Sequence, residues 1–273
     1  MDRSTPPVLV VFSDLDGTLL DHKTYAFEAA RPALAALQEI GSALILASSK
    51  TAREIAPIRD ALGFSHCPAI AENGAGVMPP GKEAQGTDDA PYRDLRQRLD
   101  RLPSRFRDHF AGFGDWSTEE VARQTGLSRE AASAARARQF SEPGLWSGTE
   151  AHLPEFLRAI SDVGLSARRG GRFLTLSFGG SKADRMEDIL ASYTPPGAPP
   201  PRSLALGDAP NDVEMLERAD RGIIIFNPGG TPIQALQGER DGTIIRSTLP
   251  GPEGWNVGVR QAVAEVQKPS ARV

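Results

Sequence analysis

Cysteine and long apolar runs are both scarce in this chain, and each shortage excludes a class of protein. Cys67 is the only cysteine among 273 residues. A disulfide within the chain is therefore impossible, and a reducing, cytoplasmic location is expected. Residues 1–7 carry no basic cluster, and the apolar run after them is too short for a signal sequence or a membrane span. We therefore expect no membrane partner.

A strong excess of charge of either sign is also missing. The formal net charge is −4, from 31 Lys and Arg against 35 Asp and Glu, which gives no reason to expect a nucleic-acid partner. Hydrophobic residues make up 40% of the chain, which is ordinary for a globular protein. A chain of this length forms one large domain or two modest ones.

The sequence does contain several short apolar runs, and each ends at polar side chains. Residues 8–12 are apolar without alternation, as is typical of a strand buried on both faces of a parallel sheet, and the run stops at Asp14 and Asp16. A second run, residues 43–47, ends at Ser48 and Ser49, and a third, residues 204–206, ends shortly before Asp208. Because parallel strands end at one edge of a sheet, these polar groups are expected to converge there.

The order of elements predicts an α/β fold with a doubly wound parallel sheet. Helical patterns over residues 27–40 and 51–62 alternate with the runs at 8–12, 43–47 and 68–71, which implies right-handed crossovers. The pattern resumes with a helix over 181–193, strands at 204–206, 222–226 and 243–245, and a last helix over 256–266. We predict that residues 1–80 and 179–273 form this core.

Residues 81–178 differ from the core and predict an inserted α+β domain. Helical patterns occur near Leu95, after Ser117 and Ser128, and over 154–163, with a loop expected over 79–90. Residues 165–169 and 172–178 flank Gly170-Gly171, which predicts a β-hairpin. The three tryptophans are expected to be buried anchors rather than sugar-stacking residues.

The polar groups at the predicted sheet edge suit phosphate chemistry. Aspartate oxygens favour Mg²⁺, and the absence of His and Cys from the set argues against zinc. Asp14 is placed to attack phosphorus, and Asp16 to give and take the proton. Lys182 at a helix start is unfavourable unless a phosphate binds there. The alternative is that these aspartates only cap turns or helices, and that Ser48 and Ser49 are ordinary loop residues.

Four short motifs resemble those of the haloacid dehalogenase superfamily. They are Asp14-Leu15-Asp16-Gly17-Thr18, Ser48, Lys182, and Gly207-Asp208-Ala209-Pro210-Asn211-Asp212, in that order. The insertion between the second and third motifs resembles a type IIB cap. Further stretches are similar to mannosyl-3-phosphoglycerate phosphatases: Ser48-Ser49-Lys50-Thr51, Ala71-Glu72-Asn73-Gly74-Ala75, Ser141-Glu142-Pro143, Gly171-Arg172-Phe173-Leu174 and Gly251-Pro252-Glu253-Gly254-Trp255.

This resemblance implies a Mg²⁺-dependent phosphatase that converts mannosyl-3-phosphoglycerate to mannosylglycerate, a compatible solute, through an aspartyl-phosphate. Arg172 would bind the glycerate carboxylate. The alternative interpretation is that Arg168, Arg169 and Arg172 form a basic face exposed to solvent. The predicted site comprises catalytic Asp14, Asp16 and Lys182, metal ligands Asp14, Asp16, Asp208 and Asp212, and phosphate- or substrate-binding Ser48, Ser49, Glu72, Asn73, Gly74, Arg172 and Asn211.

Two alternatives stay open at this point. One is a phosphatase of the same type for glucosyl-3-phosphoglycerate or a hexose phosphate. The other is a non-catalytic phospho-receiver or phosphate-sensing module, which also uses an acidic pocket, Mg²⁺ and a lysine but needs no inserted domain. The sequence leaves the choice between monomer and homodimer undetermined.

Overall fold

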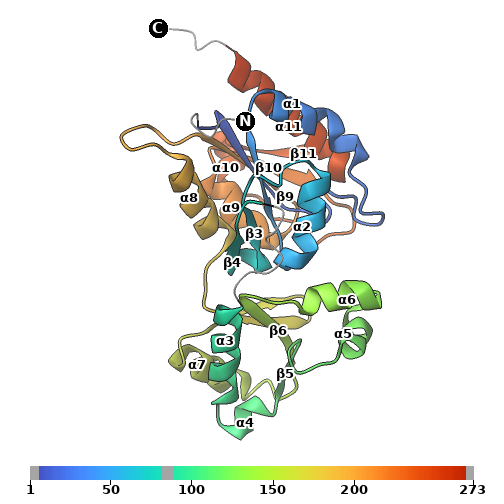
Figure 1. The fold of residues 1–273 in the computed structure, drawn as a ribbon, viewed down its shortest axis with the longest axis vertical. Helices are drawn as coiled ribbons and strands as arrows, with labels where there is room; N and C mark the ends of the chain where they lie inside the picture. The colour runs from blue at the N-terminus through green and yellow to red at the C-terminus, as the bar shows by residue number, and fades with distance from the viewer. Residues whose placement is uncertain (1–5, 82–88, 269–273) are drawn as a thin grey trace.

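Two sheets organise the chain, and the smaller one is inserted between strands of the larger (Figure 1). The computed structural model describes residues 6–81 and 89–268. The larger sheet has seven strands in the order β11-β10-β9-β1-β2-β3-β4. Their bounds are β1 Leu9–Ser13, β2 Ala43–Ala47, β3 Ala69–Ala71, β4 Gly76–Met78, β9 Arg202–Gly207, β10 Arg221–Phe226 and β11 Ile244–Pro250. The helices of this core are α1 Arg31–Glu39, α2 Ala52–Ala61, α8 Lys182–Tyr193, α9 Val213–Arg218, α10 Gln237–Asp241 and α11 Gly251–Gln267, with 3₁₀ turns η1 Glu28–Ala30, η2 Glu72–Gly74 and η4 Pro210–Asp212.

The smaller sheet belongs to residues 89–178, called the cap below. Its four strands lie in the order β5-β6-β8-β7 and pair antiparallel. Figure 1 shows this sheet and its helices as a separate layer beyond β4 and α2. The bounds are β5 Phe110–Gly112, β6 Ser141–Trp146, β7 Ser166–Gly170, β8 Phe173–Ser177, α3 Ala90–Asp100, α4 Ser104–Arg107, α5 Thr118–Thr125, α6 Arg129–Arg136 and α7 Leu153–Asp162.

Strand β1 lies at the centre of the larger sheet and sets the position of the acidic residues. All five of its residues are buried, and it pairs in parallel with β2 on one side and β9 on the other. In the register, Ser13 lies opposite Leu46 and Leu206, so β1, β2 and β9 end together. The predicted α/β fold with a mostly parallel sheet is confirmed, and only β4 among its strands runs antiparallel to its neighbour.

The helix starts follow the capping chemistry of the sequence. Thr51, Ser117 and Ser181 each cap a helix, and each forms a capping box with the acidic residue three positions on. The hairpin about Gly170-Gly171 is also present as β7 and β8. The predicted loop over 79–90 falls largely on residues 82–88, which lie outside the described part of the chain.

Several elements were not predicted, either because their sequences argue against the observed structure or because they are too short to show a pattern. Strand β6 has the sequence SEPGLW, with a proline and a glycine that usually argue against a strand. Strands β4 and β5 are too short, at three residues each, to show a periodic pattern. Helix α6 ends at Arg136, and the backbone amides of Gln139 and Phe140 just beyond it bind a core carboxylate described below.

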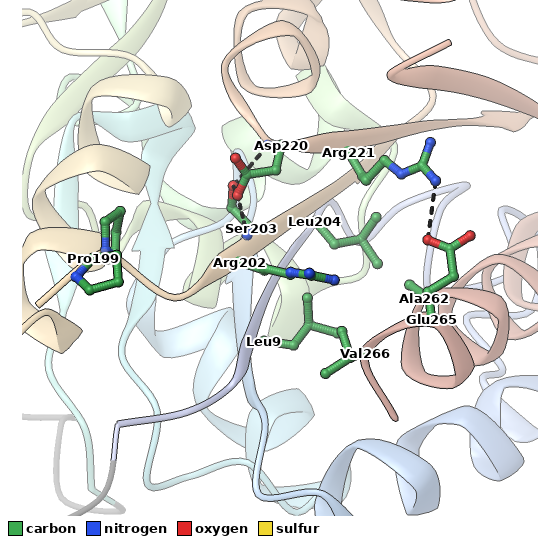
Figure 2. Close-up of a pocket in the computed structure, with 11 residues that line it drawn as sticks. Leu9, Pro199, Arg202, Ser203, Leu204, Asp220, Arg221, Ala262, Glu265 and Val266 are labelled. Atoms are coloured by element: carbon green, nitrogen blue, oxygen red, sulfur yellow. Dashed lines mark hydrogen bonds and ion pairs between the residues drawn. The ribbon is translucent and has the colours of Figure 1, made fainter. Parts of the chain in front are cut away.

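A pocket of about 480 Å³ lies at the edge of the larger sheet where the strands begin (Figure 2). It is bordered by Leu9 of β1, Arg202 of β9 and Val266 of α11, and an ion pair of 3.1 Å joins Arg221 and Glu265 beside it. The predicted acidic residues lie at the opposite ends of the same strands. Among residues 6–81 and 89–268, no helix has both the length and the apolar character needed to cross a membrane.

Candidate active site

Three charged side chains from three distant segments meet where the central strands end. The ammonium of Lys182, the first residue of α8, donates to Asp14 Oδ1 at 2.6 Å and to Asp212 Oδ1 at 2.7 Å. Asp14 directly follows β1, and Asp212 ends η4. Asp14, Lys182 and Asp212 are buried, at 8%, 2% and 0% exposed. The sequence prediction that these residues converge therefore agrees with the geometry.

A fourth charged residue, Asp208, is held in this group by side chains that sequence reasoning missed. Thr18 Oγ1 and Asn227 Nδ2 each donate to one oxygen of the Asp208 carboxylate, both at 2.7 Å. The second oxygen of Asp212 accepts the backbone amide of Asp208 at 3.1 Å. Thr18 lies within a motif already singled out, and Asn227 directly follows a strand. The position of Asn227 after β10 was the signal that could have revealed it.

Burial and mutual repulsion shift the pKa values of these groups. Burial raises the pKa of Asp14 well above its ordinary value, Lys182 opposes the rise, and Asp212 adds to it. Burial alone would lower the pKa of Lys182, but the carboxylates of Asp14 and Asp212 outweigh it and raise that pKa. Burial also raises the pKa of Asp208, against the hydrogen bonds from Asn227 and Thr18. Three carboxyl groups therefore share one ammonium, and their mutual repulsion is one cause of the raised pKa values of Asp14 and Asp208.

The donor set fits a hard divalent cation. Asp14, Asp208 and Asp212 each offer a carboxylate oxygen, and these oxygens lie within 4.8 Å of one another. Oxygen ligands with little nitrogen or sulfur competition suit Mg²⁺, which commonly binds through one or two carboxylates and completes its shell with water and phosphate. Three of the four predicted metal ligands therefore lie together.

The side chain of Asp16, the remaining predicted ligand, points to a different partner. One of its oxygens forms an ion pair of 2.8 Å with Lys50, and its other oxygen, Oδ1, is buried without a hydrogen-bond partner among the described residues. The Lys50 ammonium also lies 5.1 Å from the centre of the Tyr25 ring. Burial would lower the pKa of Lys50, but Asp16 raises it. Lys50 is a second cation of the site that the sequence prediction left out, although it stands in the Ser48-Ser49-Lys50-Thr51 stretch.

The η2 turn, predicted to bind substrate, joins three parts of the molecule. Glu72, Asn73 and Gly74 all have positive φ, at 54°, 58° and 91°. The Glu72 carboxylate accepts hydrogen bonds from the cap: the amides of Gln139 and Phe140, at 2.8 and 3.3 Å, and the Ser141 hydroxyl, at 2.7 Å, with Arg138 paired at 3.2 Å. The Glu72 carboxylate is thus occupied by residues of the cap, and its predicted contact with substrate stays a prediction.

The other two residues of η2 face the catalytic loops. Asn73 Oδ1 accepts from Asn211 Nδ2 at 3.1 Å, so the two predicted binding residues contact each other. Gly74 packs against the peptide between Ser181 and Lys182, where a Cβ would collide with backbone atoms. Consecutive left-handed residues are costly and persist only where the surroundings fix them. This turn therefore links the cap to the start of the lysine helix.

Replacing Gly74 by alanine should displace Lys182 although Gly74 itself carries no functional group. The added methyl group would push the backbone of Ser181 and Lys182 away and would also be strained at a φ of 91°. We expect a loss of about 2 kcal/mol or more in the free energy of unfolding and at least a roughly 100-fold lower kcat, since misplacement by about 1 Å has effects of this size. Gly81→Ala, where φ is 111° but no atom of the described residues lies within 4 Å of the added methyl group, is the control for backbone strain alone. Equal effects of the two changes would contradict the contact argument.

The remaining predicted residues are placed as follows. Ser48 is buried at the end of β2, its carbonyl accepts the Asn73 amide at 2.9 Å, and its hydroxyl accepts the Lys50 amide at 3.2 Å. Ser49 is exposed, and its carbonyl accepts from Arg138 at 3.5 Å. Arg172 lies exposed at the β7–β8 turn with its guanidinium 5.1 Å from the centre of the Phe173 ring. Within the described residues, no hydrogen bond or ion pair joins Arg172 to the carboxylate group.

The comparisons with known proteins agree with this fold and with the motifs at its centre. Residues 11–112 match the sequence model of a family described as haloacid dehalogenase-like hydrolase. A phosphatase of the haloalkanoate enzyme superfamily from Bacteroides thetaiotaomicron superposes with a TM-score of 0.64 at 20% identity, with 97% of each chain covered. A Thermoplasma acidophilum protein gives 0.61 at 15% identity, covering 95% of this chain and 99% of its own.

A sucrose-phosphatase from Synechocystis sp. PCC6803, solved with sucrose and phosphate, gives a TM-score of 0.56 at 13% identity and covers 95% of this chain and 98% of its own. At sequence identities of 20% or less, these structures show a shared fold, which extends through both the core and the cap. The sequence match begins within β1 and includes the acidic motif and the start of the cap, as far as the end of β5. The chain is therefore similar in sequence to haloacid dehalogenase-like hydrolases over residues 11–112, and it shares the fold of these solved structures along nearly its whole length.

Proposed function

We propose that this chain is a Mg²⁺-dependent phosphatase that hydrolyses a sugar-phosphoglycerate, with mannosyl-3-phosphoglycerate as the first candidate. The observation that carries the proposal is the buried group of Asp14, Asp208 and Asp212 around the ammonium of Lys182. Buried like charges of this kind are unfavourable unless a ligand completes them. A cation and a phosphate together would supply the missing charges and give each residue a role.

Asp14 is the nucleophile of the proposed reaction. One of its carboxylate oxygens attacks phosphorus, the bond from phosphorus to the sugar-glycerate oxygen breaks, and Asp16 delivers a proton to that leaving oxygen. Asp16 then takes a proton from a water molecule, whose oxygen attacks the phosphorus of the aspartyl-phosphate. Inorganic phosphate leaves and both carboxyl groups return to their starting states. Mg²⁺, held by Asp14, Asp208 and Asp212, would offset the negative charge of the phosphoryl group when bound.

The surroundings of the two aspartates support Asp14 as the nucleophile and Asp16 as the group that transfers the proton. Asp14 is held by Lys182 in a fixed position, as a nucleophile requires. Asp16 is tethered through one oxygen only, and its side chain is 33% exposed. The oxygen not bound by Lys50, Oδ1, is buried and has no partner among the described residues, so it is available to exchange a proton with a bound leaving group or a bound water molecule. Lys182 would also bind the equatorial oxygens of the phosphoryl group.

In this proposal the choice of substrate lies with the cap, residues 89–178. Arg172 of the hairpin is exposed and makes no ion pair within the described residues, which leaves its planar guanidinium available for a carboxylate. A sugar-phosphoglycerate carries such a carboxylate beside its phosphate, whereas a hexose phosphate does not. A cytoplasmic location would give the enzyme access to a substrate of this kind.

A substrate panel tests the proposal. Phosphate release would be measured for mannosyl-3-phosphoglycerate, glucosyl-3-phosphoglycerate, a hexose phosphate and sucrose phosphate, with Mg²⁺ and with a chelator. We expect Mg²⁺-dependent release with the highest kcat/KM for the mannosyl compound. A flat profile would indicate a broad phosphatase, and a phosphorylated Asp14 that persists for many minutes without turnover would favour a receiver or sensing module.

Arg172→Ala provides the matching variant for substrate choice. Loss of a hydrogen-bonded ion pair of about 1.5–3 kcal/mol predicts a KM about 10- to 100-fold higher for the sugar-phosphoglycerate. The kcat/KM for p-nitrophenyl phosphate, which has no carboxylate, should stay unchanged. Arg168→Ala, an exposed arginine of the same hairpin, serves as the control. An unchanged KM in Arg172→Ala would remove this residue from the proposal.

A further inference from the structure

The Gly251-Pro252-Glu253-Gly254-Trp255 stretch has no part in the chemistry described so far, yet its indole lies against the catalytic strand. Helix α11 begins at Gly251, immediately after β11, at the edge of the sheet where Asp14 lies. A side chain at Gly254 would collide with the carbonyl oxygen of Leu249, so glycine there allows the helix to pack closely on the end of β11. This packing brings Trp255 into the core, where it is 0% exposed.

A chain of two buried hydrogen bonds runs from this indole to the backbone of Asp14. Trp255 Nε1 donates to the Ser13 hydroxyl oxygen at 2.9 Å, and that hydroxyl donates to the carbonyl oxygen of Asp14 at 2.7 Å. On the other side, the Asp14 amide donates to the carbonyl of Leu206 in β9 at 2.9 Å. The Asp14 residue is thus fixed at its amide by the sheet and at its carbonyl by Ser13.

We propose that Trp255 is a positioning residue for Asp14, acting through Ser13; the inference rests on the proposed role of Asp14 as nucleophile. A hydroxyl group has one proton to donate and can rotate. The indole N–H occupies an acceptor site of the Ser13 oxygen and so directs the hydroxyl proton toward the Asp14 carbonyl. Because Ser13 is 0% exposed, water cannot take over either bond.

The consequence for the reaction comes from geometry rather than from charge. The Asp14 carboxylate reaches Lys182 from a backbone that leaves β1 at this point, so a rotation of the Asp14 peptide moves the attacking oxygen relative to the phosphate. Small displacements of a nucleophile have large effects on the rate and little effect on binding. Loss of the indole N–H should therefore lower kcat and leave KM nearly unchanged.

The experiment compares Trp255→Phe, Ser13→Ala and the double variant. We expect each single change to lower kcat about 10-fold or more. If Trp255 acts through Ser13, the double variant should be no more than about twofold slower than the slower single variant. Trp146→Phe in the cap, where the ring stacks on Phe156 at 4.5 Å, makes the same chemical change away from the site and should keep kcat. A kcat within twofold of wild type in Trp255→Phe, or independent effects that multiply in the double variant, would overturn the proposal.

Hydrogen exchange of the Asp14 backbone amide gives a readout that does not depend on turnover. In Trp255→Phe and Ser13→Ala we expect this amide to exchange about 10-fold faster than in wild type, and in Trp146→Phe at the wild-type rate. Exchange of Val10, nearer the start of β1, reports general loosening of the sheet, and equal acceleration there would contradict a local effect. If the wild-type protein releases no phosphate from any ester, the proposed function fails, while the exchange data still decide whether Trp255 fixes Asp14.

Discussion

Asp14→Asn is expected to stop phosphate release, with kcat at least about 10⁴-fold lower, because an amide cannot act as the nucleophile. The fold should survive the change. Burial raises the pKa of Asp14, so the stability that this group gives at low pH is lost as the pH rises through its raised pKa. Asparagine does not ionise, and at pH 7 without added metal the melting temperature of the variant should equal or exceed that of wild type.

Asp241→Asn, an exposed aspartate in the same core, is the control for this change and should leave both kcat and the melting temperature unaltered. A mass spectrum of the protein quenched in acid during turnover adds direct evidence, since wild type should carry a phosphoryl group that Asp14→Asn lacks. Turnover at more than one hundredth of the wild-type rate in Asp14→Asn would rule out the aspartyl-phosphate pathway.

Lys182→Met should damage both activity and stability. The pKa of Lys182 is raised by Asp14 and Asp212, so its stabilising charge is fully present at neutral pH and is lost only as the pH rises through that raised pKa. Removing the ammonium leaves these two carboxylates buried without their cation, which predicts a loss of about 3–5 kcal/mol in the free energy of unfolding. The kcat should fall about 10³-fold as the phosphoryl charge loses its partner.

Added Mg²⁺ separates the electrostatic explanation from simple misfolding. Because the variant has more uncompensated negative charge, Mg²⁺ should raise its melting temperature more than that of wild type. Lys268→Met, an exposed lysine after α11, should behave as wild type. A variant that melts at the wild-type temperature and responds to Mg²⁺ like wild type would show that Lys182 does not balance these carboxylates.

Most of the core could be predicted from the sequence because its signals are local, and the three-residue strand β4 is the exception in the larger sheet. Apolar runs gave β1 and β2, and capping residues such as Thr51 and Ser181 marked the helix starts. Parallel topology then placed Asp14, Lys182 and Asp208 at one edge. The cap was harder, because strand β6 contains Pro143 and Gly144 and is stabilised by its neighbours rather than by its own residue preferences.

The partners of the site residues could not be derived from the sequence because they depend on long-range contacts. Nothing local to Glu72 indicates that residues 138–141 of the cap would occupy its carboxylate. The same holds for Asn227 on Asp208 and for the Lys50 ammonium on Asp16. Residue type predicted what chemistry these groups could do, but packing determines which groups are free to do it.

The pairing of β1 with β9 has a consequence for biosynthesis. The hydrogen bond from Thr18 to Asp208 spans 190 positions, and the whole cap lies between them in the chain. During translation β1 emerges early, but the strand that fixes one of its sides, and the aspartates after that strand, follow only once the cap has been made. A ribosome-bound chain that stops before β9 would therefore hold an acidic strand with an open edge and no complete cation site, so the candidate site forms only after the cap has been made.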